Sequence, residues 1–214
     1  MSSTTGFELH RARGPFNAAF FSVLGPYIEW NVRRQKRRVF AGLPRTVVEL
    51  GPGVGANLRH LHPGTTLVAI EPNVAMHRRL RAAAERRGVR LDLRDRVAER
   101  TGLPDRSADS VISSLVLCTV SDPAEVLAEV RRVLRPGGTF RFVEHVAARD
   151  GSPTRALQRA LRRPWAWVFE GCSCERDLAG LVRAAGFARV DIEPYRLHSP
   201  FVSFNTQIAG VAHA

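Results

Sequence analysis

The sequence predicts an α/β fold in which helices cover both faces of a mainly parallel, doubly wound β-sheet. Short apolar runs rich in β-branched residues alternate along the chain with segments of helical length, which is typical of repeated strand-helix-strand units. Hydrophobicity within these runs is continuous, and this pattern indicates strands that are buried on both faces. The length of 214 residues suits one domain of this kind.

The amino-terminal residues precede the repeating pattern. Residues 1–15 are polar and contain two glycines and a proline, so we expect a loose arm. Residues 16–42 have helical periodicity that is interrupted at Gly25-Pro26, and we expect them to form a helical lid. We therefore divide the chain into an arm and lid at residues 1–42 and a main domain at residues 43–214, with an insertion at about residues 149–174.

Within the main domain, four apolar runs predict strands and the segments between them predict helices. The predicted strands are Thr46–Leu50, Thr66–Ile70, 110–117 and 139–143, and the predicted helices are residues 55–62, 73–87 and 123–134. A further helix is expected at residues 175–185, ending at Gly186. Residues 187–192 and 201–212 are expected to pair as an antiparallel hairpin at the carboxyl end of the chain.

Composition limits the class of protein. No apolar stretch reaches the roughly 18 to 20 residues that cross a bilayer, and the first thirty residues lack the pattern of a secretory signal, so we expect a soluble cytoplasmic protein without a transmembrane segment. Cys118, Cys172 and Cys174 lack the paired spacing of a structural zinc site and are too few for a disulfide framework. We expect no metal.

The formal net charge of +12 first indicates a nucleic acid or an anionic surface as partner. However, Lys36 is the only lysine among 32 basic residues, and arginine is spread along the whole chain. The densest basic run, residues 33–38, lies in a segment with one apolar helical face. We interpret this run as a solvated helix face; an acidic or phosphorylated substrate and a nucleic acid remain open alternatives.

Small residues follow the first predicted strand, in the order Glu49-Leu50-Gly51-Pro52-Gly53-Val54-Gly55-Ala56-Asn57. They permit a tight turn in which a ligand approaches the backbone at the start of the next helix. Gly51, Gly53 and Ala56 have the spacing of a dinucleotide site, and Glu71 follows where a carboxylate binds the ribose diol. The spacing alone fits a nicotinamide cofactor as well as other adenosyl cofactors.

Glu49 helps to separate these cofactors. A carboxylate at this position repels a pyrophosphate, whereas it attracts the α-ammonium or sulfonium group of S-adenosylmethionine. Two acidic residues at consecutive strand ends, Glu49 and Glu71, have no evident packing purpose. Charge complementarity therefore favours S-adenosylmethionine over a nicotinamide cofactor.

At these residues the sequence resembles the class I S-adenosylmethionine-dependent methyltransferases with a type 11 methyltransferase domain. Residues 49–55 resemble their first motif, Glu71-Pro72 their ribose-binding strand end, and residues 103–109 and 131–138 their later signatures. Within the family, the similarity is greatest to the thiol S-methyltransferase group, on residues 115–120, residues 142–148, Trp165 and residues 170–172. The resemblance runs from about Tyr27 to Phe187 and implies a Rossmann-like sheet of seven strands.

The resemblance also implies roles for single residues. Glu49, Gly51, Gly53 and Asn57 would surround the methionine end of the cofactor, Glu71 and Pro72 the ribose, and Met76 the adenine. The position that meets the adenine amine in many relatives is Val97 here, with Ala98 and Glu99 following, so this contact falls to the backbone or to Glu99. Leu115 and Val116 resemble the residues that line the cofactor beside the substrate cavity.

The chemistry of methyl transfer points to candidate catalytic residues. In-line displacement needs no protein nucleophile, and a base is needed only where the acceptor must lose a proton. His145, preceded by Glu144 at a strand end, is the best candidate base; a contact that merely shapes the wall is the alternative. Thr119 could orient an acceptor. We interpret Cys118 as a small buried apolar residue and not as a reactive thiol.

A thiol with a pKa of about 8.5 is already partly ionised at neutral pH, so among the possible acceptors it has the least need of a catalytic base. We therefore expect methylation of a small, apolar acceptor, with thiol sulfur favoured over oxygen, nitrogen or carbon. In relatives the insertion closes over the acceptor, which implies a pocket that includes Trp165 and Trp167, with Tyr27 covering the cofactor; core packing of these aromatic residues is equally open.

Several other functions remain open at this point. The acceptor could instead be phenolic, quinone-like or a lipid head group, methylated on oxygen, nitrogen or carbon. The chain could also bind RNA through its basic surface, bind the cofactor without turnover, or act as a nicotinamide-dependent oxidoreductase. The sequence leaves the oligomeric state undefined.

Overall fold

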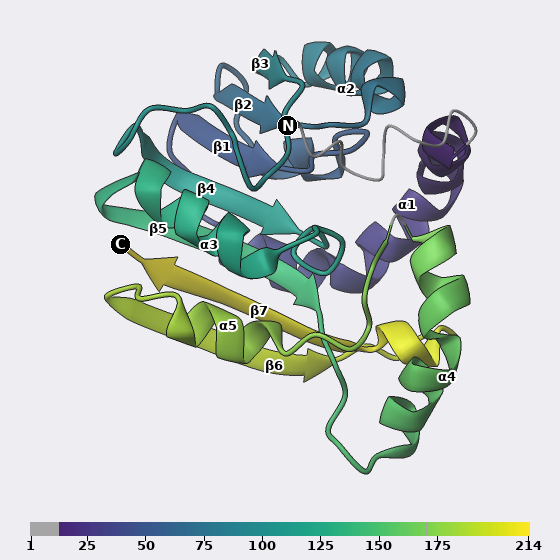
Figure 1. Ribbon diagram of the computed structural model, residues 1–214. Coiled ribbons are helices and arrows are strands. Elements are labelled where there is room, and N and C mark those ends of the chain that lie inside the picture. The colour runs from purple at the N-terminus through teal and green to yellow at the C-terminus, as the bar shows by residue number, and fades with distance from the viewer. Residues whose placement is uncertain (1–12, 170) are drawn as a thin grey trace, which may run out of the picture.

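One mixed sheet of seven strands organises the described part of the protein, in the order β3-β2-β1-β4-β5-β7-β6 (Figure 1). The computed structural model describes residues 13–169 and 171–214. Most of the arm expected at residues 1–15 lies outside these ranges. Residue 170, which is part of the segment 170–172 that resembles the thiol S-methyltransferase group, also lies outside them. Residues 13–15 form the first turn of helix α1 instead of belonging to the arm.

The predicted fold class is confirmed by the strand pairing. The strands are β1 (Thr46–Leu50), β2 (Thr66–Ile70), β3 (Arg90–Arg94), β4 (Ala108–Ser114), β5 (Leu134–His145), β6 (Arg189–Arg196) and β7 (Thr206–His213). Strands β1 to β5 pair in parallel, and β7 pairs antiparallel with both β5 and β6. The chain continues from β1 to β2 on one side and returns to β4 on the other. This reversal creates a topological switch point, where open sheets bind their ligands.

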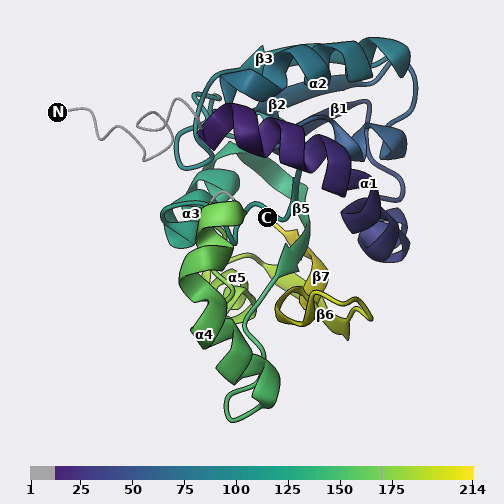
Figure 2. The same ribbon diagram turned by 90° about the vertical axis from the view of Figure 1, so that its right-hand side faces the viewer.

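Helices cover both faces of the sheet (Figures 1 and 2). The helices are α1 (Arg13–Val39), η1 (Ala56–His60), α2 (Val74–Arg86), α3 (Pro123–Val133), α4 (Pro153–Val168), α5 (Leu178–Ala184) and η2 (Val202–Phe204). Helices α1 and α2 share one face, and α3 and α5 cover the other. Helix α4 packs against η2 beyond the carboxyl ends of the parallel strands.

Side-chain caps in the sequence explain where several helices begin. Asn73 accepts a hydrogen bond from the amide of Ala75 at the start of α2, and Ser152 accepts one from Arg155 in the first turn of α4. Asp122 does the same for α3, whose first residue is a proline that has no amide to satisfy. Asp177 caps α5, so this helix begins at Leu178 and residues 175–177 of the predicted helix form the approach to the cap.

The two amino-terminal helices differ from prediction. Helix α1 runs through Pro26 without the expected interruption. The residue before a proline is normally pushed out of the helical region because its N–H and Cβ clash with the proline Cδ. Gly25 has no Cβ, which relieves this clash. The helix expected at residues 55–62 is a short 3₁₀ helix, because Gly55 has a φ of 92° and starts it from a left-handed conformation.

Strand boundaries also differ, for local reasons. Strand β3 was not predicted, because its residues alternate between polar and apolar at the edge of the sheet instead of forming a continuous apolar run. Strand β4 ends at Ser114 and not at residue 117, since Leu115 has a φ of 61° that turns the chain out of the sheet. The carboxyl-terminal hairpin is confirmed with its strands displaced to β6 and β7, and residues 202–204 form η2.

The core lies between the central strands and the helices on either face. Val47, Val111 and Phe140, from β1, β4 and β5, are fully buried. Burial of each such side chain stabilises the fold by about 1.5 to 3 kcal/mol relative to exposure. No helix among the described residues is long and apolar enough to span a membrane.

Gly210 provides a test of the packing between β5, β6 and β7. A Cβ at this position would lie 2.5 Å from the Asp191 carbonyl oxygen and 2.7 Å from Phe142 Cζ. We expect Gly210→Ala to lower the free energy of unfolding by about 1 to 3 kcal/mol through overpacking, as measured by urea denaturation. Unchanged stability in Gly210→Ala would contradict the packing described here.

Candidate functional site

A cavity of about 220 Å³ opens at the switch point, beyond the carboxyl ends of β1, β2 and β4. Its walls come from the glycine turn after β1, the start of the β2–α2 connection, the loops after β3 and β4, and helix α1. The lining residues are Gly25, Ile28, Glu29, Lys36, Gly51, Pro52, Gly53, Val54, Ala56, Asn57, Ile70, Glu71, Pro72, Met76, Val97, Ala98, Glu99, Ser114, Leu115, Val116, Thr119, Val120 and Ser121. Most of the expected cofactor residues are therefore brought together.

The glycine turn needs residues without side chains. Gly51, Gly53 and Gly55 have positive φ angles of 54°, 58° and 92°, which L-residues rarely adopt. A Cβ on Gly51 would also lie 2.6 Å from Val116 Cγ2, so this glycine lets the turn pack directly against the loop after β4. The turn thus presents bare backbone to the cavity.

Glu71, the next residue after β2, reaches back across the glycine turn. Its two carboxylate oxygens accept hydrogen bonds from the amides of Gly53 at 2.9 Å and Asn73 at 2.8 Å. The side chain is almost fully buried, and burial raises the pKa of Glu71 although the two amides oppose this rise. Each oxygen can accept a further hydrogen bond, so the carboxylate can bind a pair of hydroxyl groups in the cavity.

Glu49 lies behind the cavity wall and acts on it through Asn57. Glu49 Oε1 accepts a 2.7 Å hydrogen bond from Asn57 Nδ2, which leaves the Asn57 carbonyl as an acceptor. Glu49 Oε2 and Asn57 Oδ1 are both buried, with no partner among the described residues. Complete burial raises the pKa of Glu49 to about 7, against the opposing effects of Asn57 and Lys36. Contrary to expectation, Glu49 does not itself line the cavity.

An ion pair on α1 that was not predicted from the sequence also lines the cavity. Lys36 Nζ lies 2.6 Å from Glu29 Oε2, and each side chain is 3% exposed. Burial raises the pKa of Glu29, but the nearby His60 ring, with Nε2 3.6 Å from Glu29 Oε1, and the charge of Lys36 bring it down to about 2. The expectation that residues 33–38 form a solvated face holds for the arginines but is wrong for Lys36. The sequence did contain a signal for this pair: Lys36 is the single lysine, and it lies seven residues from Glu29 on the same helix face.

The opposite end of the cavity is less polar. Met76 is buried, and its sulfur would lie 3.4 Å from a Cβ placed on Gly53. Val97 and Ala98 line this end beside Pro72, as the family resemblance implies. Glu99 Oε1 accepts a hydrogen bond from the Ser121 amide at 3.0 Å and joins the loops after β3 and β4. This end therefore offers apolar surface and backbone groups.

Glu144 holds the loop that forms the remaining wall. Its Oε1 accepts hydrogen bonds from Ser113 Oγ at 2.6 Å and from the Val116 amide at 3.2 Å. Burial raises the pKa of Glu144 to about 7 despite these donors. The loop carries Leu115 and Thr119 into the cavity, and Thr119 Oγ1 donates to the Val116 carbonyl at 2.8 Å. Glu144 positions this wall without lining it.

His145 lies away from the cavity. It is fully buried, with Nε2 2.7 Å from the Ser203 carbonyl oxygen and Nδ1 3.5 Å from Cys172 Sγ. These contacts do not support the predicted role as a base, because neither nitrogen faces an acceptor in the cavity.

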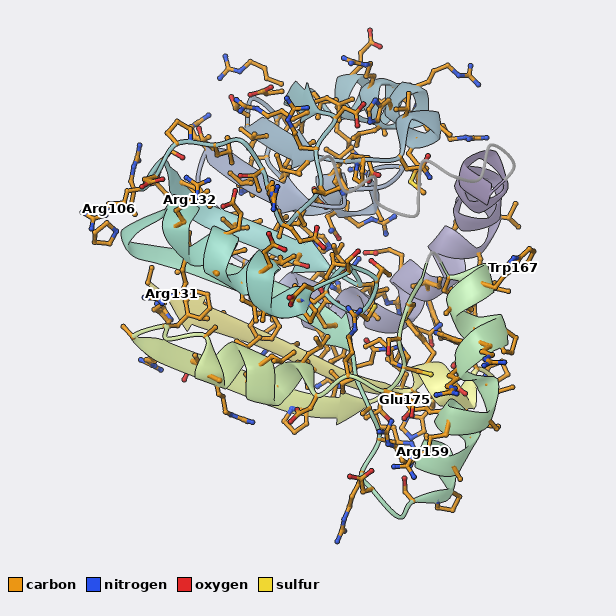
Figure 3. All side chains as sticks on the ribbon, viewed as in Figure 1. Arg106, Arg131, Arg132, Arg159, Trp167 and Glu175 are labelled. Carbon is orange, nitrogen blue, oxygen red and sulfur yellow. The ribbon has the colours of Figure 1, made fainter. Side chains whose placement is uncertain are left out.

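The three aromatic residues predicted for the pocket also lie elsewhere. Trp165 stacks on Phe169 at a centroid distance of 4.2 Å and belongs to the core. Trp167 is 61% exposed and points outward from α4 (Figure 3). Tyr27 packs edge-on against Phe201, with centroids 6.0 Å apart, while Ile28 and Glu29 face the cavity. Core packing or surface contact explains these aromatic residues better than a pocket does.

Known proteins match both the sequence and the fold. Residues 48–142 match the family described as a methyltransferase domain. Thiol S-methyltransferase TMT1B of Rattus norvegicus is 38% identical over 69% of this chain and 62% of its own length, so the chain spans less than two thirds of that relative. The Homo sapiens TMT1B is 34% identical over 80% of this chain and 75% of its own.

Two further similarities extend over nearly the whole chain. The ubiquinone/menaquinone biosynthesis C-methyltransferase UbiE of Acidiphilium cryptum is 30% identical over 86% of each sequence. The methyltransferase solved in complex with the Trm112 activator of Haloferax volcanii is 20% identical and superposes with a TM-score of 0.66, covering 100% of this chain and 99% of that one. The chain therefore belongs to the class I S-adenosylmethionine-dependent methyltransferases, close to their thiol S-methyltransferase group.

Proposed function

We propose that this protein transfers the methyl group of S-adenosylmethionine to the thiol sulfur of a small, apolar acceptor, and that the cavity at the switch point holds the cofactor. The observation that carries the proposal is the charge arrangement around the bare glycine turn. Glu71 and the Glu29–Lys36 pair line one cavity, and Glu49 lies directly behind it. The cofactor supplies an electrophilic methyl group on a sulfonium ion.

The cavity groups match the zwitterionic amino acid at one end of this cofactor. Lys36 supplies a buried ammonium group for its carboxylate. Glu29 and the unpartnered carbonyl of Asn57 supply acceptors for its ammonium group. Glu49 keeps the Asn57 amide turned so that its oxygen, and not its nitrogen, is available to the ligand. These contacts support a role for α1 as the lid over the methionine end of the cofactor.

The remaining cavity residues suit the nucleoside. Glu71 would bind both ribose hydroxyls, since each of its oxygens has an unused lone pair. Met76, Val97 and Ala98 would contact the adenine ring, and Leu115 with Val116 would border the reacting methyl group. The bare backbone at Gly51 and Gly53 allows the close approach that this placement needs.

The acceptor side favours a nucleophile that ionises without help. Every carboxylate in the described cavity wall already has a partner: Glu29 pairs with Lys36, Glu71 accepts two amides and Glu99 accepts the Ser121 amide. Ser114 Oγ, buried without a partner among the described residues, and Thr119 can orient an acceptor but cannot deprotonate one at neutral pH. A thiol can react without a protein base, because part of it is already ionised at neutral pH. The related TMT1B proteins are named thiol S-methyltransferases.

The similarity to the C-methyltransferase UbiE makes a phenolic or quinone-like acceptor the second candidate. Such an acceptor needs a base or a low pKa of its own. Turnover of phenols or quinols without turnover of any thiol would replace the sulfur assignment and leave the cofactor site intact.

Partial cofactors can separate the roles of Lys36 and Glu71. We expect Lys36→Met to weaken S-adenosylhomocysteine binding roughly 10- to 100-fold, the worth of a charge-assisted hydrogen bond, and to leave 5′-methylthioadenosine, which lacks the amino acid, nearly unaffected. Glu71→Gln should weaken both ligands. Calorimetric titration measures these affinities, with the exposed neighbour Arg37→Met as the matched control. An equal loss of both ligands in Lys36→Met would contradict the assigned position of the amino acid.

Cofactor affinity should also depend on pH through Glu49. Its pKa of about 7 means that the side chain is largely neutral below pH 7 and anionic above it. Because an anion favours the cationic ligand, affinity for S-adenosylmethionine should rise between pH 6 and pH 8, by at most about tenfold per pH unit. In Glu49→Gln this rise should disappear. A variant that keeps the full pH dependence would show that another group controls it.

Because the described cavity wall has no free base, we expect the pKa of the thiol substrate, and not that of an enzyme group, to control turnover. At saturating cofactor, kcat/KM for thiols should rise with pH and level off near the pKa of each thiol, so an acidic aromatic thiol should level off at lower pH than an alkyl thiol. The test is a pH-rate profile for both thiols with labelled S-adenosylmethionine. If both profiles have one common midpoint, an enzyme group acts as the base and this description of the acceptor site is wrong.

A further inference from the structure

Three metal-ligating side chains converge in the interior, outside the cofactor cavity. Cys118 lies in the loop after β4, His145 ends β5, and Cys172 follows α4. One ligand atom of each residue lies within 4.8 Å of the other two, and all three residues are buried. His145 is 27 residues from each cysteine along the chain, which is why spacing alone did not indicate a site.

The histidine is held in the form that binds metals. His145 Nε2 lies 2.7 Å from the Ser203 carbonyl oxygen, and Gln158 Nε2 donates to the same carbonyl at 3.0 Å. A carbonyl only accepts hydrogen bonds, so Nε2 carries the proton and Nδ1 presents its lone pair toward Cys172 Sγ at 3.5 Å. Metal-bound histidines are typically fixed in this way by a hydrogen bond from the second ring nitrogen.

From this geometry we propose that Cys118, His145 and Cys172 bind a zinc ion. Two thiolates and one neutral imidazole carry two negative charges, which Zn²⁺ neutralises, so the bound site has no net charge to bury. Sulfur and imidazole ligands suit zinc better than the hard cations Mg²⁺ and Ca²⁺. The three protein ligands leave the fourth tetrahedral position to a non-protein donor.

The proposed ion would join three parts of the fold. Cys118 immediately precedes Thr119 of the cavity wall, and the Ser173 amide donates to the Cys118 carbonyl at 2.7 Å. The segment after α4 thus runs along the loop after β4. A metal at this point would fix both segments against β5 and so hold the acceptor wall in place. The ion takes no part in the methyl transfer itself.

Cys174 offers a matched control within the same segment. Its thiol is fully buried, like the other two, but donates to the Gln158 carbonyl at 3.3 Å and lies outside the group of three. We expect the full chain, purified from zinc-supplemented cells, to carry about one zinc ion per molecule by elemental mass spectrometry. Cys118→Ser and Cys172→Ser should lose most of this zinc, because each removes a thiolate ligand, while Cys174→Ser should retain it.

A second measurement on the unaltered chain covers the case in which a variant fails to fold. After chelation, titration with Co²⁺ should produce a thiolate-to-cobalt charge-transfer band that saturates at one equivalent and disappears when Zn²⁺ is added. The melting temperature should fall on chelation and recover with Zn²⁺. The proposal is overturned if the unaltered chain shows neither zinc nor this band, or if Cys174→Ser loses the ion as completely as Cys172→Ser. Cofactor affinity is measured separately, so either result leaves the proposed function untouched.

Discussion

The burial of charge around the glycine turn is the constraint on which this site depends. Glu29, Lys36, Glu49 and Glu71 are each 5% exposed or less, and all lie in or behind one cavity wall. Removing such groups from water costs several kcal/mol per ion unless partners compensate. Lys36 compensates Glu29, and amide groups compensate Glu71, but Glu49 Oε2 and Asn57 Oδ1 lack partners among the described residues. A wall with these unmet acceptors is complementary to a cationic, hydrogen-bonding ligand.

The sheet makes this arrangement possible by bringing distant residues to one edge. Strands β1 and β2 end side by side, which sets Glu49 and Glu71 on adjacent strand ends, and β4 returns on the other side of β1. The left-handed conformation of Leu115 and the hydrogen bonds of Glu144 then direct the next loop against Gly51. Glu144 thus supports the cavity from behind, much as Glu49 supports Asn57. Glu49 and Glu144 thus support the cavity wall from behind, while Glu29 and Glu71 line the cavity.

Local sequence patterns predicted the parts of the fold and site that local physics determines. Continuous apolar runs identified β1, β2, β4 and β5, and the glycines identified the turn, because these features follow from burial and backbone freedom within a few residues. The position of Lys36 depends on how α1 packs over the sheet, and no local pattern sets that packing. The same limit explains His145, whose strand-end position suggested the cavity although its ring faces Ser203 and Cys172. The edge strand β3 was missed because it lacks the apolar continuity of a buried strand.

The central claim is that the ion pair of α1 holds the amino-acid end of S-adenosylmethionine and that the carboxylate after β2 holds its ribose. A crystal structure of the chain with S-adenosylhomocysteine tests it most directly. The account predicts the ligand carboxylate within hydrogen-bonding distance of Lys36 Nζ, its ammonium group beside Asn57 Oδ1, and both ribose hydroxyls on Glu71. A ligand bound in the reverse direction, or an intact Glu29–Lys36 pair with the amino acid directed away from α1, would contradict the account.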